Sequence, residues 1–141
     1  MFNRILVAVD GSKMSDKALK SAIQFAKERY STIGVIHVEK NIRFPELMSN
    51  ESVDQVYISL REEGSEILNN AVSFAAEEGI EIEPIYIMGD PAIQIVKKAE
   101  EGNYQLIIMG SRGLGNIKGL MLGSVSQRVS QLSHCPVLII K

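Results

Sequence analysis

Short apolar runs alternate along the whole sequence with segments of helical periodicity. The first run, residues 5–9, is rich in β-branched side chains and ends at the turn 10–12, as a strand buried on both faces does. Apolar residues spaced three and four apart then continue to about Tyr30, which indicates an amphipathic helix. Such strands, separated by helices, predict an α/β fold with an open parallel sheet and helices on both of its faces. The later strands are expected at residues 33–38, 80–87, 106–109 and 136–140.

Capping residues predict where three of the helices begin or end. Ser15 is expected to cap the first helix. Asp90 and Pro91 fit the N-cap and the first helical position of a later helix, because proline tolerates the missing amide hydrogen there. A long helix predicted from Val53 ends at Gly79, since glycine adopts the left-handed conformation that terminates helices.

Two segments depart from the patterns of buried strands and helices. Residues 80–87 begin as an alternation of apolar and polar side chains, which predicts a strand at an edge of the sheet. Residues 39–52 are polar, contain Pro45 and have no periodicity, so we expect a mobile loop. A loop of this length within a compact domain suggests a function.

Size and charge exclude several classes of protein. The 141 residues have the length of one domain, which we expect to span residues 1–141. The net charge of −2 argues against a nucleic-acid partner, because a domain that binds phosphate backbones should be strongly basic. No window of about 18 residues is apolar and uncharged, so we expect no membrane partner. Arg4 and Asp10 lie where a secretory signal would be apolar, which predicts a cytoplasmic protein.

The glycine-rich segment at residues 110–126 follows the fourth predicted strand. Ligands of open parallel sheets bind beyond the carboxyl ends of the strands, and this segment is expected to lie there. It holds five of the eleven glycines, which let backbone amides turn toward an anion. A helix opening at Gly123-Ser124 would add its amides and dipole, and Arg112 and Lys118 would add charge. Composition alone leaves two interpretations open: a phosphate site, or a flexible loop before a serine-capped helix.

Two familiar phosphate motifs do not fit this segment. A Walker loop requires a glycine directly before its lysine, whereas Lys118 follows Ile117. A dinucleotide fingerprint could start at Gly113 and Gly115, but Lys118 occupies the position of its third glycine. We therefore expect neither a Walker loop nor a dinucleotide fingerprint.

The glycine spacing matches a different signature. Gly110, two residues, Gly113, nine residues and then Gly123-Ser124 form a pattern that resembles the ATP-binding signature of the universal stress protein family. The resemblance covers the whole chain. Its other landmarks are the opening strand and turn at residues 5–12, the second strand at 35–38, the start of the third helix at 89–91 and the closing strand at 135–140.

The resemblance implies a Rossmann-like sheet of five parallel strands in the order 3-2-1-4-5, with ATP across the ends of strands 1 and 4. Val38 would offer backbone groups to the adenine. Mg²⁺ is expected to accompany the ATP. The remaining implied contacts are Ala8 and Asp10 beside the nucleoside, Met109 and Gly110 at the ribose, and Gly113, Gly123, Ser124 and Val125 at the phosphates.

The resemblance also implies partners. The family is typically dimeric through its last strand, here residues 136–140. That strand is apolar and would be an unprotected edge in a monomer, which supports a homodimer. A regulatory protein that reads the ATP-bound conformation in a stress response is the further partner we expect.

Three functional hypotheses remain open. The first is a regulatory protein whose conformational equilibrium ATP shifts, with slow hydrolysis at most. The second is an enzyme, either an ATPase or a nucleotidyl transferase. Phosphoryl transfer needs a residue that orients the nucleophile, and none beyond Asp10 stands out. The third is a dimeric scaffold that binds no nucleotide.

Two polar residues have structural interpretations beside the functional ones. Asp10 fits a role at the ribose hydroxyls or at a metal ion, or only a role in the turn with Gly11. His37 lies inside a predicted strand and is expected to be a packed residue with a fixed tautomer. No pair of histidines or Cys-x-x-Cys spacing indicates a metal site, so we assign no metal ligand and no catalytic residue.

Overall fold

The computed structural model describes residues 1–113 and 122–141. In this part of the chain strands and helices alternate as the sequence predicts. In chain order they are β1 (Arg4–Ala8), α1 (Lys13–Arg29), β2 (Thr32–Glu39), α2 (Asn50–Glu77), β3 (Ile82–Met88), α3 (Pro91–Glu101), β4 (Leu106–Gly110), α4 (Ser124–Leu132) and β5 (Val137–Ile140).

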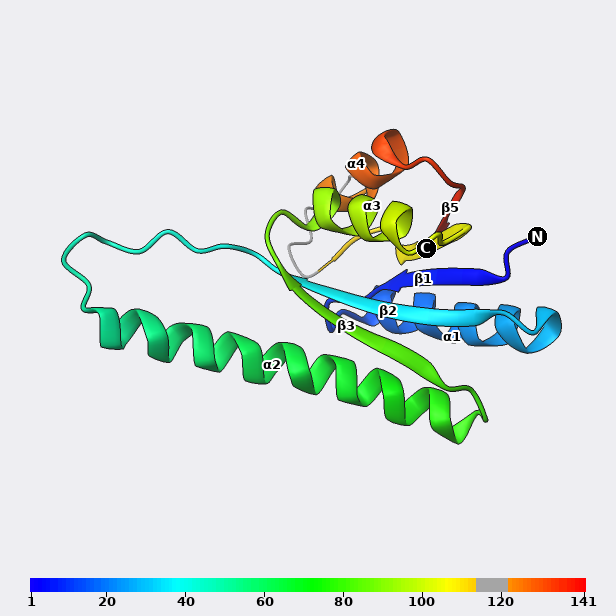
Figure 1. Cartoon of the computed structure of the whole chain (residues 1–141), viewed down its shortest axis with the longest axis horizontal. Helices are drawn as coiled ribbons and strands as arrows, with labels where there is room; N and C mark the ends of the chain where they lie inside the picture. The colour runs from blue at the N-terminus through cyan, green and yellow to red at the C-terminus, as the bar shows by residue number, and fades with distance from the viewer. Residues whose placement is uncertain (114–121) are drawn as a thin grey trace.

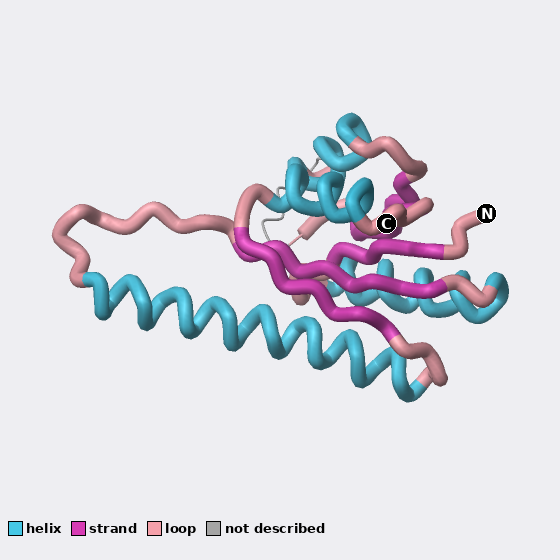
Figure 2. Tube along the Cα trace, viewed as in Figure 1, coloured by secondary structure: helices cyan, strands magenta, loops and turns pink. Residues whose placement is uncertain are grey.

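The strands form one parallel sheet in the order β3-β2-β1-β4-β5. This arrangement confirms the predicted α/β fold, the strand order 3-2-1-4-5 and the edge position of β3. Figure 2 shows the strands as a twisted layer between two groups of helices. Because all strands run in the same direction, their carboxyl ends meet at one edge of the sheet, where a ligand site is expected.

Two helices cover each face of the sheet, α1 and α2 on one side and α3 and α4 on the other (Figure 1). Successive side chains of a strand point to opposite faces, so each strand supplies both layers. Val7 of β1 joins the buried cluster with α1 and α2, and the adjacent Leu6 joins the cluster with α3 and α4. This two-sided burial explains why the central strands are almost entirely apolar.

The first helix begins earlier than predicted. Its N-cap is Ser12, whose hydroxyl oxygen accepts a hydrogen bond of 3.1 Å from the N–H of Ser15. Ser15 therefore lies inside the first turn, and its predicted capping role is wrong. The sequence offers two serines before the apolar stripe, and Gly11, with a φ of +84°, turns the chain so that Ser12 reaches the helix end. The predicted cap Asp90 and first residue Pro91 of α3 are confirmed.

The connection between β2 and α2 is shorter than predicted and comprises residues 40–49 rather than 39–52. The hydroxyl of Ser49 accepts a hydrogen bond from the N–H of Ser52 and starts α2 three residues before Val53. The rings of Phe44 and Tyr57 pack edge to face, with centroids 5.3 Å apart. Figure 1 shows this loop and the first turns of α2 projecting beyond the carboxyl end of the sheet.

The end of α2 and the start of β5 lie close to their predicted positions. Gly79, with a φ of +77°, follows the end of α2 as predicted. The last strand begins at Val137, one residue after the predicted start, since Pro136 has no amide hydrogen to offer the sheet. Among the described residues, no helix is both long and apolar enough to cross a lipid bilayer.

Candidate functional site

A cleft of about 550 Å³ lies at the carboxyl ends of the strands. Its volume is within the usual range of small-molecule sites. The ends of β1, β2 and β4 line it, together with the first turns of α1, α3 and α4. The structure brings together all ten residues that the resemblance and the glycine-rich segment singled out: Ala8, Asp10, Val38, Met109, Gly110, Arg112, Gly113, Gly123, Ser124 and Val125.

The lining on the α3–α4 face of the sheet is apolar. Ala8, Val38 and Met109 lie there at the ends of three adjacent strands. Sequence reasoning missed two further members, Ile36 and Ile95. Strand alternation could have found Ile36, which lies two residues before Val38 and so on the same face. A surface of this kind suits the flat ring of a heterocycle.

A carboxylate fixed by a tight turn stands beside this apolar surface. The N–H of Ser12 donates a hydrogen bond of 2.9 Å to Oδ1 of Asp10. The N–H of Asp10 donates in turn to the hydroxyl of Ser15, at 3.3 Å. Gly113 lies against the other carboxylate oxygen so closely that a Cβ at residue 113 would collide with it. The carboxylate and the glycine loop therefore approach each other across the cleft.

Hydrogen bonds around Ser111 hold the start of α4 over the end of β4. The N–H of Gly123 donates to the carbonyl oxygen of Ser111 at 2.7 Å, and the hydroxyl of Ser126 donates to the same oxygen at 2.8 Å. The N–H of Ser111 donates to the carbonyl oxygen of Ile140 at 2.8 Å. The junction is thus anchored to β5 as well, so its backbone geometry is set by three separate segments.

Three helices begin at the cleft, and their N-terminal dipole ends favour a negative charge there. The first turns of α1 and α3 are capped by the side chains of Ser12 and Asp90. The N-cap of α4 is Gly123, and within the described residues no side chain caps this helix. Arg112, half-buried in the lining, adds a positive charge. The predicted cation Lys118 lies outside the described residues.

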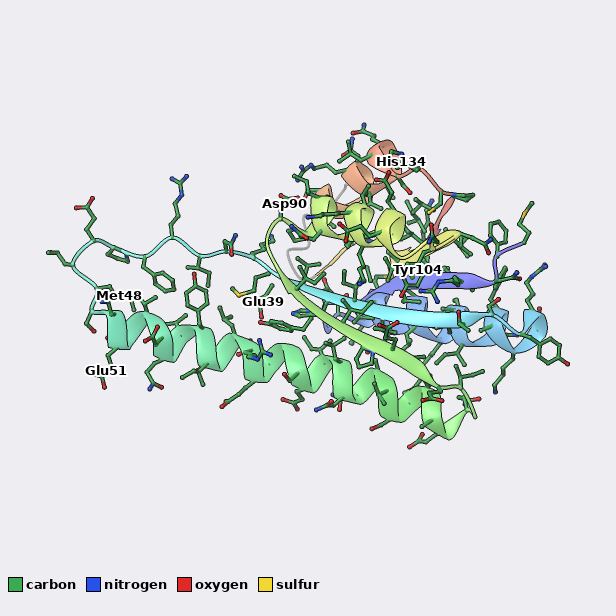
Figure 3. The ribbon with its side chains drawn as sticks, in the orientation of Figure 1. Glu39, Met48, Glu51, Asp90, Tyr104 and His134 are labelled. Carbon is green, nitrogen blue, oxygen red and sulfur yellow. The ribbon has the colours of Figure 1, made fainter. Side chains whose placement is uncertain are left out.

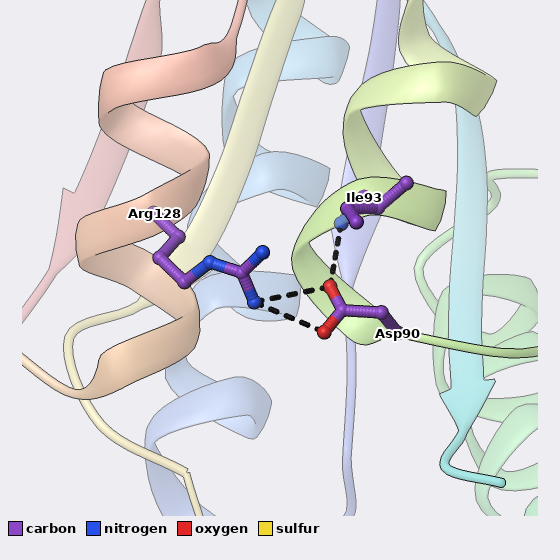
Figure 4. A network of polar contacts seen from close by, with 3 residues as sticks. All are labelled: Asp90, Ile93 and Arg128. Carbon is purple, nitrogen blue, oxygen red and sulfur yellow. Dashed lines mark hydrogen bonds and ion pairs between the residues drawn. The ribbon is translucent and has the colours of Figure 1, made fainter.

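An ion pair ties α3 to α4 behind the cleft (Figure 4). A guanidinium nitrogen of Arg128 lies 3.0 and 3.2 Å from the two carboxylate oxygens of Asp90. Asp90 Oδ1 also accepts the N–H of Ile93, at 3.0 Å. The Ile93 N–H and then Arg128 hold the pKa of Asp90 below its usual value. The pair links the helix that carries Pro91 in the lining to the helix that carries Ser124.

His37 is a packed residue, as predicted, and it also contacts the cleft. It is 6% exposed, and its Nδ1 lies 2.9 Å from the carbonyl oxygen of Val9, which requires a proton on Nδ1. Its Nε2 lies 3.7 Å from Glu39.

The ring of Tyr86 lies beside His37. Burial, and next the charge of Glu39, raise the pKa of Tyr86, whereas the charge of Arg61 lowers it. Figure 3 shows Glu39 at the same end of the sheet as Asp90.

The lining combines features that suit one kind of ligand. An apolar surface, a carboxylate beside it and a helix start at a glycine suit a heterocycle joined to a sugar and an anionic group. Within the described residues, no group of three or more His, Cys, Asp or Glu side chains could hold a metal ion.

Comparison with known proteins places this architecture. The family model described as "Universal stress protein family" matches residues 1–141. Universal stress protein YxiE of Bacillus subtilis is 43% identical, and the match covers 100% of both chains. The solved structure of the Methanocaldococcus jannaschii protein MJ0577 has a TM-score of 0.87 at 32% identity, with 100% of this chain and 96% of that chain covered.

A further solved structure was determined with a nucleotide. The Archaeoglobus fulgidus universal stress protein in complex with dAMP has a TM-score of 0.71 at 27% identity, and the match covers 100% of both chains. The full-length match to the family, the identity with YxiE and the likeness to MJ0577 agree with the strand order described above. The chain belongs to the universal stress protein family.

Proposed function

We propose that the cleft binds ATP and that the protein is a nucleotide-dependent regulator. The observation that carries this proposal is the approach of Gly113 to the Asp10 carboxylate beside the start of α4 at Gly123, which no side chain caps within the described residues. A Cβ at residue 113 would collide with the Asp10 carboxylate, so only glycine fits this approach without a shift. The dAMP bound by the Archaeoglobus fulgidus relative supports a nucleotide as the ligand.

The parts of the cleft fit the parts of ATP. The apolar residues Ala8, Val38 and Met109 suit the adenine, and the Asp10 carboxylate suits the ribose hydroxyls. The first amides of α4, with the charge of Arg112, suit the phosphates. Mg²⁺ would be held by phosphate oxygens and the Asp10 carboxylate, and it would neutralise phosphate charge.

We propose regulation rather than efficient catalysis. ATP can shift a conformational equilibrium only by binding one state more tightly than the other, and a partner protein would read that state. The described lining holds two carboxylates, Asp10 and Glu39, and we assign neither as a base that orients an attacking water. Hydrolysis by the purified protein is expected at a rate near the uncatalysed background. A turnover number orders of magnitude above background would instead support an ATPase.

In this proposal residues 1–141 form one domain, and two copies of the chain pair through β5 as a homodimer. β5 is an edge strand with an exposed apolar side chain, Leu138, which is 41% exposed. An unprotected apolar edge is a ready site for pairing with a second strand. The exposed apolar edge of β5 therefore supports the proposed dimer.

Calorimetric titration of nucleotide-stripped protein with Mg·ATP, ADP and AMP tests the binding site. We expect micromolar ATP affinity in the wild type and its loss in Gly123→Val. The φ of Gly123 is −71°, and an added Cβ would meet its neighbours at 3.4 Å or more, so the variant is expected to fold. Ser49→Ala, which alters the N-cap of α2 outside the cleft lining, is the matched control and should bind as the wild type does.

Two results would contradict the proposal. Unchanged ATP affinity in Gly123→Val would remove the α4 start from the site. No heat and no thermal stabilisation of the wild type at saturating ATP would leave a scaffold that binds no nucleotide.

A further inference from the structure

The hydroxyl of Ser126 bridges the end of β4 and the start of α4. It is directed at two carbonyl oxygens, that of Ser111 at 2.8 Å and that of Gly123 at 3.1 Å. Ser126 is 2% exposed and lies in the first turn of α4, at the wall of the cleft. A hydroxyl has one proton to donate, so the two carbonyls share it.

Neither carbonyl depends on this hydroxyl for a partner. The N–H of Gly123 already donates to Ser111 at 2.7 Å, and the N–H of Gln127 donates to Gly123 at 3.0 Å. Loss of the hydroxyl therefore leaves neither carbonyl oxygen without a partner. A buried acceptor left unpaired is usually what makes removal of a buried polar group costly. What the hydroxyl adds is a restraint between strand and helix.

The start of α4 is built differently from the other helix starts. At α1, α2 and α3 a side-chain oxygen of Ser12, Ser49 or Asp90 accepts an amide hydrogen of its own helix. At α4 the cap is Gly123, and the anchoring side chain is a donor one turn inside the helix. The caps of α1, α2 and α3 each occupy the N–H of the third residue after the cap, whereas at α4 the corresponding N–H, that of Ser126, has no side-chain cap within the described residues.

We propose that Ser126 is a positioning residue for the phosphates of the bound nucleotide. It contacts no ligand, and its hydroxyl holds the first turn of α4 at the angle where the amides of Ser124 and Val125 meet the phosphate oxygens. The orientation of these two amides controls how strongly they bind phosphate, because hydrogen bonds weaken steeply with misalignment. The inference rests on the proposed function, since it assumes that these amides meet phosphate.

Ser126→Ala separates this role from a general structural one. Alanine is the better helix former, so α4 is expected to persist. The affinity for Mg·ATP should fall about three- to tenfold, whereas the affinity for adenosine, which has no phosphate, should stay within about twofold of the wild type. Adenosine is measured by competition against ATP on the same protein.

Ser130→Ala is the matched control in the same helix. The hydroxyl of Ser130 donates to the carbonyl oxygen of Gln127 at 2.7 Å, on the exposed face of α4. Its removal should change neither affinity. If Ser126→Ala does not fold, Ser126→Cys fills the same space with a weaker donor and should give a smaller loss in the same direction.

Each contrary result has a distinct meaning. Equal losses for ATP and adenosine in Ser126→Ala would show a merely structural residue and overturn the inference. Unchanged ATP affinity in that variant would overturn it as well, while the proposed nucleotide site would stand. A wild type that binds neither ATP nor adenosine would overturn both the site and the positioning role.

Discussion

Gly113 and Asp10 meet across the cleft so closely that a β-carbon on residue 113 would collide with the Oδ2 atom of the aspartate. The contact joins the end of β1 to the loop after β4, two segments about a hundred residues apart in the chain. It brings the backbone at Gly113 to the carboxylate that the turn at Ser12 holds in place. A substitution at either residue would therefore alter the geometry of the cleft.

Gly113→Ala should lower the affinity for Mg·ATP about tenfold or more, because the new β-carbon displaces the loop or the Asp10 carboxylate. Gly113 is exposed, so the variant is expected to fold, with the free energy of unfolding lowered by about 1 kcal/mol. Calorimetric titration beside urea unfolding checks both expectations. Wild-type ATP affinity in the alanine variant would show that the approach of these two residues has no role in binding.

Asp90 should make stability depend on pH in the acid range. The Ile93 N–H and Arg128 lower the pKa of its carboxyl in the folded state. The ionised form therefore stabilises the fold above the unfolded pKa of about 3.9, and this contribution is lost as the pH falls through the folded pKa. Asp90→Asn retains an N-cap but removes the charge.

The wild type should exceed Asp90→Asn in stability at neutral pH by less than about 1 kcal/mol, because the ion pair with Arg128 is exposed. The difference should shrink as the pH falls below the unfolded pKa of about 3.9 and through the lower folded pKa. Urea unfolding of both proteins across this range measures it. A difference that is independent of pH would assign the effect to packing instead of charge.

Gly64→Ala should destabilise the protein although alanine is the better helix former. A β-carbon at residue 64 would collide with the ring of Tyr86 and approach His37 to 3.0 Å. The gain in helix propensity is about 1 kcal/mol, whereas overpacking typically costs about 1–3 kcal/mol. Thermal and urea unfolding measure the net effect.

Ser65→Ala is the matched control for Gly64→Ala, since Ser65 is exposed on the same helix. It should leave stability unchanged or slightly raise it. If the Gly64→Ala variant were more stable than the wild type, Tyr86 would have to move aside at no cost. That result would contradict its packing between His37 and Arg61.

Leu138→Lys should separate the proposed homodimer into monomers. The charge would lie on the exposed edge strand β5, where lysine opposes strand-to-strand pairing. Sedimentation velocity of the wild type and the variant measures the change in mass, and the same substitution at exposed Ile93 is the control. A wild type that sediments as a monomer at all concentrations would remove β5 as the interface.

Local sequence patterns predicted most of the fold. The apolar run at residues 5–9 and its successors indicated the strands because burial on both faces demands continuous apolar side chains. Asp90 and Pro91 marked the start of α3 because both residues act within one turn of the chain. The serine that caps α1 was placed wrongly at Ser15, since two candidates lie within reach and only the turn at Gly11 selects Ser12.

The sequence by itself therefore determined the α/β class, the edge position of β3 and, through the spacing of Gly110, Gly113 and Gly123, the segment that lines the cleft. Tertiary structure alone decided which residues meet. By helix propensity alone Gly64 would only weaken α2, yet the sheet places it against Tyr86. Ser126 reaches Ser111 only after β4 and α4 are assembled. Helix and strand periodicity are local properties, whereas these contacts depend on the order in which distant segments pack around one sheet.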